Sequence, residues 1–447
     1  MFKYLFAISF LSFFTAHAQQ HTGIAYGKFQ NSGANSSAHP AKNYTSFGDI
    51  KWKYKTEGKI FSSPAVCNGV VYIGSEDHCL YAIDGKSGEI HWKFTTGGAV
   101  HSSSAVYKNV VYFGSYDGFY YALNATSGKL IWRFKTGGEK FVGRKGLWNM
   151  APKSQYMEDQ YDFFLSSPVL DLNDKDLTVY FGSSDGNLYA LNANTGKKKW
   201  AFKTNGIVHN SPALYRGKVY FGSWDTYLYA LDARTGKLQW KFKTGEQPVY
   251  HLLEGIQSSP TCADGMLYFG SRDGFFYALN ATTGKQAWKY SANNSWVLTT
   301  AAIKDGLVYA GTSDTFLFLA FDAKTGKEKF HYRANGYVYS SPAVSGSTAY
   351  FGDFSGSLLA VDIRTGKLTG KFATAGRIKN APKVLNPKGD VDFSFLAKGK
   401  IDSLYTTSVE VMDILYTLGP IVSSPVVNNN VIYFGSADGY LYALNMK

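Results

Sequence analysis

A motif that recurs eight times along the chain limits the folds that this sequence can adopt. In outline it reads SSPAV, VYFGS, a turn with Asp-Gly, LYALD, a TGK turn and WKFKT. Most copies are 40 or 41 residues apart, and three intervals are longer, at 68, 48 and 83 residues. A period of about 40 residues is typical of propellers and related repeat proteins. The glycines that mark the eight copies are Gly74, Gly114, Gly182, Gly222, Gly270, Gly311, Gly352 and Gly435.

Each copy divides into four short segments with the composition of β-strands. The segments are rich in Val, Tyr, Phe and Leu and are bounded by Gly, Asn or Asp, as in strands that are joined by hairpins. Proline in most SSPAV segments suits an edge strand, and the serines there suit a water-filled channel. Four strands in about 40 residues predict an all-β fold, an eight-bladed β-propeller.

The eighth copy has three strands, and its fourth strand has to come from elsewhere. A matching segment, Asp49 to Thr56, precedes the first copy, and we expect it to complete the last blade as an outer strand and to close the ring. Closure also removes an exposed sheet edge that would favour aggregation. Phe330 and Gly370 stand where tryptophan is expected. The matching tryptophans are Trp52, Trp92, Trp132, Trp200, Trp240 and Trp288.

From residue 46 to 447 the repeat resembles the pyrroloquinoline-quinone-type (PQQ-like) propeller repeat. The resemblance rests on YALxAxTGKxxW followed by SSPAV and VYxGSxDG. That family includes quinoprotein alcohol dehydrogenases and the outer-membrane assembly factor BamB. The resemblance is specific for the fold but says little about function, because this fold is used by enzymes and by binding scaffolds.

The N-terminus has the features of a secretory signal peptide. Lys3 precedes an apolar run from Tyr4 to Phe14, and Ala16-His17-Ala18 follows, so we expect residues 1–18 to be cleaved near Ala18. The protein is then periplasmic or extracellular, with a flexible leader over residues 19–45 and a propeller over 46–447. No other stretch is apolar for long enough to span a membrane.

The formal net charge of +13 does not by itself indicate nucleic-acid binding. Many lysines recur in the Gly-Lys turns and form a regular rim, and export argues against a nucleic-acid partner. We expect a monomer.

Residues that recur from blade to blade are expected to stabilise the blades and not to bind a ligand. The Asp after the Gly-Ser pair is expected to accept hydrogen bonds from the backbone of its own turn. We favour this role over that of a metal ligand. We predict no Cys67–Cys79 disulfide, because the two residues lie at opposite ends of a strand. The loop from Asp171 to Asp176 lacks the glycine and the final glutamate of a calcium loop. No metal site is predicted.

Three insertions interrupt the repeat at the same connection, just before the Ser/Pro strand. They lie near residues 138–165, 245–257 and 373–422, and equivalent positions place them on one face, over the channel mouth. The third insertion predicts one short lid helix over about 403–416, capped by Asp402. Its apolar stripe is Leu404, Val411, Met412 and Leu415.

Candidate ligand-binding residues stand where the repeat varies. The residue before each Ser/Pro strand points toward the channel mouth, and its polar examples are His101, His209, Gln257 and Tyr339. A histidine pair there is compatible with ligand contact, base catalysis or a metal, as well as with plain packing. In the first insertion, Arg144 and Trp148 are further candidates.

Two functions follow from this pattern. The first is an exported binding or scaffold protein that engages a protein or glycan partner through its loop-rich face, with no catalytic residues and no cofactor. The alternative, which the resemblance implies, is a PQQ-dependent quinoprotein dehydrogenase that oxidises an alcohol or a sugar, with the quinone and calcium at the channel mouth. No vicinal cysteine pair supports the alternative.

Overall fold

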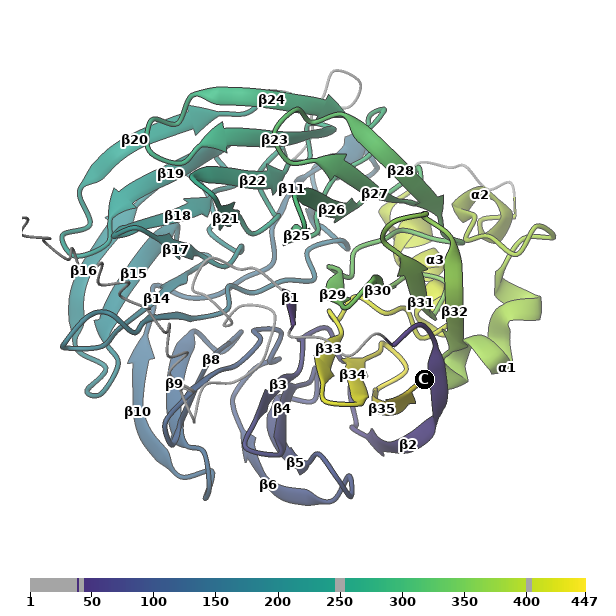
Figure 1. The fold of residues 1–447 in the computed structure, drawn as a ribbon, viewed down its shortest axis with the longest axis horizontal. Coiled ribbons are helices and arrows are strands. Elements are labelled where there is room, and N and C mark those ends of the chain that lie inside the picture. The colour runs from purple at the N-terminus through teal and green to yellow at the C-terminus, as the bar shows by residue number, and fades with distance from the viewer. Residues whose placement is uncertain (1–37, 40–43, 246–253, 399–403) are drawn as a thin grey trace, which may run out of the picture.

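The chain folds into an eight-bladed β-propeller, as the repeat predicts (Figure 1). The computed structural model describes residues 38–39, 44–245, 254–398 and 404–447. Eight antiparallel sheets of four repeat strands surround one axis, and the innermost repeat strand of each sheet is the Ser/Pro strand. In seven blades the four strands are consecutive in the chain.

The blades, each from the innermost to the outermost strand, have the following bounds. The first four are β3 Ala65–Cys67, β4 Val70–Gly74, β5 Cys79–Asp84, β6 Ile90–Thr95; β7 Ala105–Tyr107, β8 Val110–Ser115, β9 Phe119–Asn124, β10 Leu130–Lys135; β13 Val169–Asp171, β14 Thr178–Gly182, β15 Asn187–Asn192, β16 Lys198–Lys203; and β17 Ala213–Tyr215, β18 Lys218–Gly222, β19 Tyr227–Asp232, β20 Leu238–Lys243. The last four are β21 Thr261–Ala263, β22 Met266–Gly270, β23 Phe275–Asn280, β24 Gln286–Ser291; β25 Ala302–Lys304, β26 Leu307–Gly311, β27 Leu317–Asp322, β28 Glu328–Arg333; β29 Ala343–Ser345, β30 Thr348–Gly352, β31 Ser357–Asp362, β32 Leu368–Ala373; and β33 Val426–Asn428, β34 Val431–Gly435, β35 Tyr440–Met446 and β2 Phe47–Lys55.

The N-terminal segment closes the ring. Strand β2 pairs antiparallel with β35, and Trp52 lies opposite Ala443. Figure 1 shows the purple β2 beside the yellow β35, where the two ends of the propeller meet. The predicted closure is therefore confirmed. Two residues from the region expected to be a leader, Ala38 and His39, also form a short strand, β1, that pairs parallel with the innermost strand β29.

The repeated aspartates fix their own turns, as expected. Asp77, for example, accepts hydrogen bonds from the backbone N–H of Cys79 at 3.1 Å and from the Tyr81 hydroxyl at 2.7 Å. The same pair of bonds forms in six blades, at Asp77, Asp117, Asp185, Asp225, Asp273 and Asp438. All three cysteines are free thiols and buried, so the prediction of no Cys67–Cys79 bond is confirmed.

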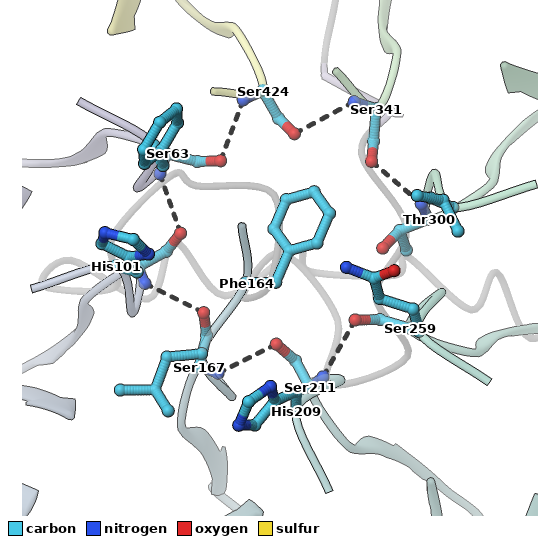
Figure 2. A pocket seen from close by; sticks show the side chains of 15 residues that line it. Ser63, His101, Phe164, Ser167, His209, Ser211, Ser259, Thr300, Ser341 and Ser424 are labelled. Carbon is cyan, nitrogen blue, oxygen red and sulfur yellow. Dashed lines mark hydrogen bonds between the residues drawn. The ribbon is translucent and has the colours of Figure 1, made fainter. Parts of the chain in front are cut away.

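The channel serines bind one another instead of lining open water. Seven of the eight backbone N–H groups of the ring donate to a side-chain oxygen of the next blade (Figure 2). The ring consists of Ser63, Ser103, Ser167, Ser211, Ser259, Thr300, Ser341 and Ser424. The ring of Phe164 lies at the centre of this circle (Figure 2). The expectation of a water-filled channel is wrong at this level, because an aromatic side chain occupies the axis.

The described part of the third insertion contains three helices, not the single lid helix that was expected. They are α1 Ala375–Val384, α2 Phe393–Leu396 and α3 Tyr405–Tyr416, and Figure 1 shows them beside β31 and β32. The expected helix is α3. Its N-cap position is Leu404, without a side-chain cap, and Asp402 lies outside the described residues. None of the described helices is long and apolar enough to cross a membrane.

Candidate functional site

Two insertions meet over the channel mouth and share one apolar core. In the first, β11 Gly143–Lys145 pairs with β12 Tyr156–Glu158, and the 3-10 turn η1 Leu147–Asn149 lies between them. The core joins Phe163 of the first insertion to Val411 and Leu415 of α3 and to Phe61 at the rim of the channel. Most of the second insertion, residues 246–253, lies outside the described residues.

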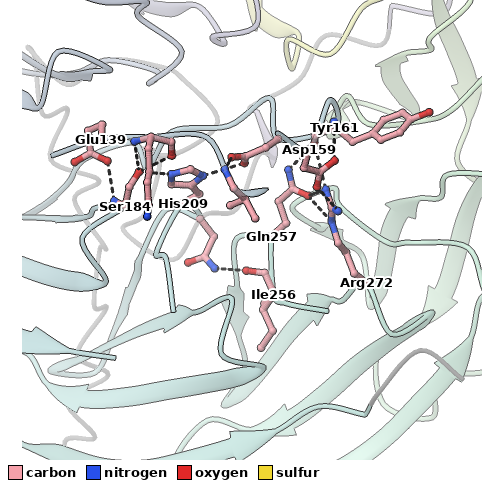
Figure 3. Close-up of polar contacts among 12 residues, drawn as sticks. Glu139, Asp159, Tyr161, Ser184, His209, Ile256, Gln257 and Arg272 are labelled. Atoms are coloured by element: carbon pink, nitrogen blue, oxygen red, sulfur yellow. Dashed lines mark hydrogen bonds and ion pairs between the residues drawn. The ribbon is translucent and has the colours of Figure 1, made fainter. Parts of the chain in front are cut away.

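His209 holds the first insertion through a fully buried ion pair. Its Nδ1 lies 2.9 Å from Oδ1 of Asp162, and its Nε2 lies 2.7 Å from Oγ of Ser184 (Figure 3). Both side chains of the ion pair are 0% exposed. Burial alone would lower the pKa of His209, but the carboxylates of Asp162 and Glu139 outweigh it and raise that pKa above its ordinary value. The pair with Asp162 therefore favours the charged imidazole more than a free histidine would.

Gln257 and Arg272 form a second buried anchor, which also appears in Figure 3. The Arg272 guanidinium pairs with Asp159, and its Nε donates to Oε1 of Gln257 at 2.9 Å. The Gln257 amide donates in turn to the carbonyl of Tyr161 at 2.9 Å. Arg272 is 1% exposed, and Trp296 lies against the guanidinium, with the ring centroid 4.2 Å away. Such pairing, hydrogen bonding and stacking compensate the burial of the charge.

His101 lies in an aromatic cage at the channel mouth. Its ring packs against Phe61 and Tyr116, with centroids 5.1 Å away in both cases. Neither ring nitrogen makes a hydrogen bond of normal geometry among the described residues, although Nε2 lies 3.5 Å from Oε1 of Glu76. Burial opposes ionisation of Glu76, but His101 and Lys59 hold the pKa of its carboxyl below the usual value.

The other three candidates, Tyr339, Trp148 and Arg144, take part in neither of the two buried anchors. Tyr339 is 2% exposed and packs its ring against Tyr337, 5.4 Å away, within the shared core. Trp148 is half-buried and contacts Tyr161 and Trp296. Arg144 is exposed on β11. The structure therefore brings His209, Gln257 and Tyr339 under the first insertion, whereas Arg144 faces outward.

The residues that anchor the insertion include several that the sequence did not single out: Asp159, Asp162, Ser184 and Arg272. Ser184 and Arg272 occupy the position just before the repeated Asp of the turn. That position varies from blade to blade, as do the candidates before each Ser/Pro strand. Its residues are Glu76, Tyr116, Ser184, Trp224, Arg272, Ser313, Phe354 and Ala437. Variation at the position just before the repeated Asp is the sequence signal that would have located Ser184 and Arg272.

The geometry leaves little room for a quinone at the channel mouth. The cavity beside the serine ring, lined by His101, His209 and Gln257, holds about 20 Å³, which is room for about one water molecule. Small-molecule sites enclose roughly 300–1,000 Å³. Calcium needs about six to eight oxygen ligands, and the described residues contain no group of three or more His, Cys, Asp or Glu side chains placed to hold a metal. These residues do not fit the quinone and its calcium.

Two family models match parts of the chain. A family model described as "Beta-alanine-activating enzyme, beta-propeller" matches residues 166–446, and one described as "Outer membrane protein assembly factor BamB" matches residues 43–146. No curated protein sequence matches the chain.

Among solved structures, BamB from Moraxella catarrhalis has a TM-score of 0.62 and 17% identity, covering 89% of this chain and 99% of its own. The quinohemoprotein alcohol dehydrogenase from Comamonas testosteroni has a TM-score of 0.65 and 14% identity, covering 92% and 79%. A europium-containing methanol dehydrogenase has a TM-score of 0.64 and 15% identity, covering 95% and 98%. At these identities the likeness concerns the fold alone.

Proposed function

The chain belongs to the propeller family whose model is described as "Beta-alanine-activating enzyme, beta-propeller", and from that premise we propose that it is an exported binding protein. Its insertion-bearing face engages a protein or glycan partner. The observation that carries the proposal is the self-closed mouth, where His209 and Gln257 bind the protein's own first insertion. A closed, anchored face presents a preformed surface to a partner.

The surface of the third insertion favours a protein over a glycan. Each of its three helices exposes a large apolar side chain: Ile378 is 73% exposed, Phe395 45% and Ile414 39%. Lys379 and Lys383 add positive charge on α1. Burial of exposed apolar side chains is a main source of stability in protein–protein complexes.

The loop between α1 and α2 is tied to the propeller. Asp390 accepts hydrogen bonds from Nη2 of Arg333 and from the amide of Asn335, both at 2.9 Å. Burial opposes ionisation of Asp390, but Arg333 and Asn335 hold the pKa of this carboxyl below its usual value. These contacts hold the loop between α1 and α2 on the propeller.

The dehydrogenase alternative is supported by the two quinoprotein structures of similar fold. Against it stands the channel mouth, which Phe164 and the shared aromatic core fill. We therefore favour the binding protein.

Site-specific photo-crosslinking tests the proposal in cells that export the protein. A photoreactive phenylalanine at Ile378 should give a discrete covalent adduct, and mass spectrometry of the adduct then distinguishes peptide from sugar. The matched control is Leu238 on the outer strand β20, which is 45% exposed and lies on the rim of the disc. Adducts at Leu238 alone, or equally at both positions, would contradict a role for the insertion-bearing face.

A further inference from the structure

The positive charge of the chain is concentrated on one part of the propeller, which we call the basic edge. It consists of the eight outer strands and of the loops that connect the third strand to the outer strand in seven blades. These segments hold 25 of the 46 Lys and Arg but three of the 33 Asp and Glu, and all 25 cationic side chains are exposed. The rest of the chain therefore carries a net negative charge. The seven loops are residues 85–89, 125–129, 193–197, 233–237, 281–285, 323–327 and 363–367.

The loops of the basic edge lie on the face of the disc opposite the three insertions. Each insertion follows an outer strand, whereas each of these loops precedes one, at the other end of the strand. Because the loops occupy equivalent positions in a ring of blades, they follow the rim of the disc, where Figure 1 labels β6, β10, β16, β20 and β24. The basic edge is therefore separate from the proposed partner-binding face.

In three blades the loop of the basic edge lacks the aspartate that begins it elsewhere. In the seventh blade, Asp362 accepts a hydrogen bond at 2.9 Å from the backbone N–H three residues later and pairs with Arg364 at 3.0 Å. In the second blade, Asn124 accepts the same backbone hydrogen bond at 2.9 Å. Asn192 and Asn280 do so in the third and fifth blades. Asparagine preserves the turn without a negative charge, so no carboxylate of the same loop compensates the lysine there.

Exposed aliphatic side chains lie beside these cations. Six of them, all on outer strands, are 40–47% exposed: Ile50, Ile90, Leu130, Ile131, Leu238 and Leu368. Four of the six directly follow a loop of the basic edge. Cationic and aliphatic side chains together are typical of surfaces that bind a membrane, because the cations contact anionic headgroups while the apolar groups enter the headgroup region. Nucleic acids and acidic polysaccharides offer anionic groups but no hydrocarbon layer.

We propose that the basic edge binds the surface of a bilayer that contains anionic lipids. The disc then rests on the membrane without spanning it, and the insertion-bearing face points away from the bilayer and is open to its partner. A flat surface suits this arrangement, because it reaches several loops of one face at once. The inference goes beyond the proposed function, since it assigns a role to the opposite face.

Co-sedimentation of the mature protein with lipid vesicles tests this proposal. The probe vesicles contain phosphatidylglycerol and phosphatidylcholine in equal parts, and the control vesicles contain phosphatidylcholine alone. At about 0.15 M salt we expect saturable binding to the anionic vesicles only, and at about 1 M salt, where the Debye length falls to about 3 Å, we expect most of it to be lost. Equal binding to both kinds of vesicle, or binding to neither, would overturn the proposal.

Two variants that lose the same charge locate the binding. The first is Lys129→Gln/Lys197→Gln/Lys237→Gln/Lys285→Gln, with one substitution in the loop of each of four consecutive blades. It should bind anionic vesicles about tenfold more weakly or worse, because each lysine near an anionic leaflet contributes a factor of about five. The control, Lys379→Gln/Lys383→Gln/Lys388→Gln/Lys398→Gln, changes exposed lysines of the third insertion and should bind as wild type does. Both should keep the wild-type melting temperature. Equal losses in the two variants would overturn the proposal.

A third variant distinguishes a membrane from other polyanions. Leu130→Ser/Ile131→Ser should weaken vesicle binding about fivefold or more, because two aliphatic side chains no longer enter the bilayer surface, and should leave binding of heparin unchanged. Vesicle binding that is insensitive to this variant would assign the basic edge to a soluble acidic polymer and overturn the proposal. The two proposals fail separately, because a lipid adduct at Leu238 is neither the peptide nor the sugar that Ile378 is expected to capture.

Discussion

At the scale of single residues, two of the candidates for ligand binding, His209 and Gln257, bind the protein's own chain. His209 and Gln257 were singled out because they break the repeat at the channel mouth, and the structure shows why they break it. His209 pairs with Asp162, and Gln257 binds Tyr161, both in the first insertion. The sequence locates the variable positions, but it does not reveal their partners, because those lie 47 and 96 residues away.

The His209–Asp162 pair predicts a pH-dependent contribution to stability. Because the pKa of His209 is raised in the folded protein, this contribution is fully present below the unfolded value of about 6.5 and is lost as the pH rises through the folded pKa. His209→Gln should lower the free energy of unfolding by roughly 3 kcal/mol at pH 5.5, because it leaves Asp162 buried without its cation. The difference from wild type should shrink toward alkaline pH.

Denaturant unfolding at a series of pH values measures this difference. The matched control is His331→Gln, because the His331 side chain is 55% exposed and forms a surface pair with Glu328, which contributes little to stability. A deficit for His209→Gln that stays constant or grows with pH would be inconsistent with a charged imidazole in the folded state.

At the scale of elements, the strands were predictable and the helices only in part. The strands follow from a pattern repeated eight times, whereas each helix occurs once and depends on its contacts. Helix α1 contains Gly376 and Pro382, which are poor signals for a helix, yet it forms because Thr374 caps it and the Gly376 N–H donates to Asp438 of the last blade. Leu404 of the expected stripe is the N-cap residue of α3 and is 40% exposed, whereas Ser408 within α3 is buried.

Two neighbouring residues of α3 provide a matched test of its packing. Leu415 is 0% exposed in the shared core, and Ile414 is 39% exposed. Leu415→Ala should lower the free energy of unfolding by about 2–5 kcal/mol, because it removes buried methyl groups and leaves a cavity. Ile414→Ala should change it by less than about 0.5 kcal/mol. Equal effects of the two substitutions in denaturant unfolding would show that α3 does not pack on the propeller through this face.

At the scale of the whole molecule, the number of blades and their closure could be predicted from the arithmetic of the repeat. The last repeat has three inner strands, and one spare outer strand precedes the first repeat. The last blade is complete only if these segments pair, as β2 and β35 do. The state of the channel could not be predicted in this way. It depends on where Phe164 points and on how two unrelated insertions pack together, and neither follows from a periodic pattern.

The central claim is that the insertion-bearing face is a closed binding surface and not the entrance to a quinone site. A thermal-shift titration of residues 19–447 with pyrroloquinoline quinone and calcium tests it most directly. A ligand that binds the folded state stabilises it by about 2.7 kcal/mol at a hundredfold excess over its Kd. We predict no saturable rise in the melting temperature. A saturable rise that is lost in the His101→Ala/His209→Ala double variant would contradict the claim and support the dehydrogenase.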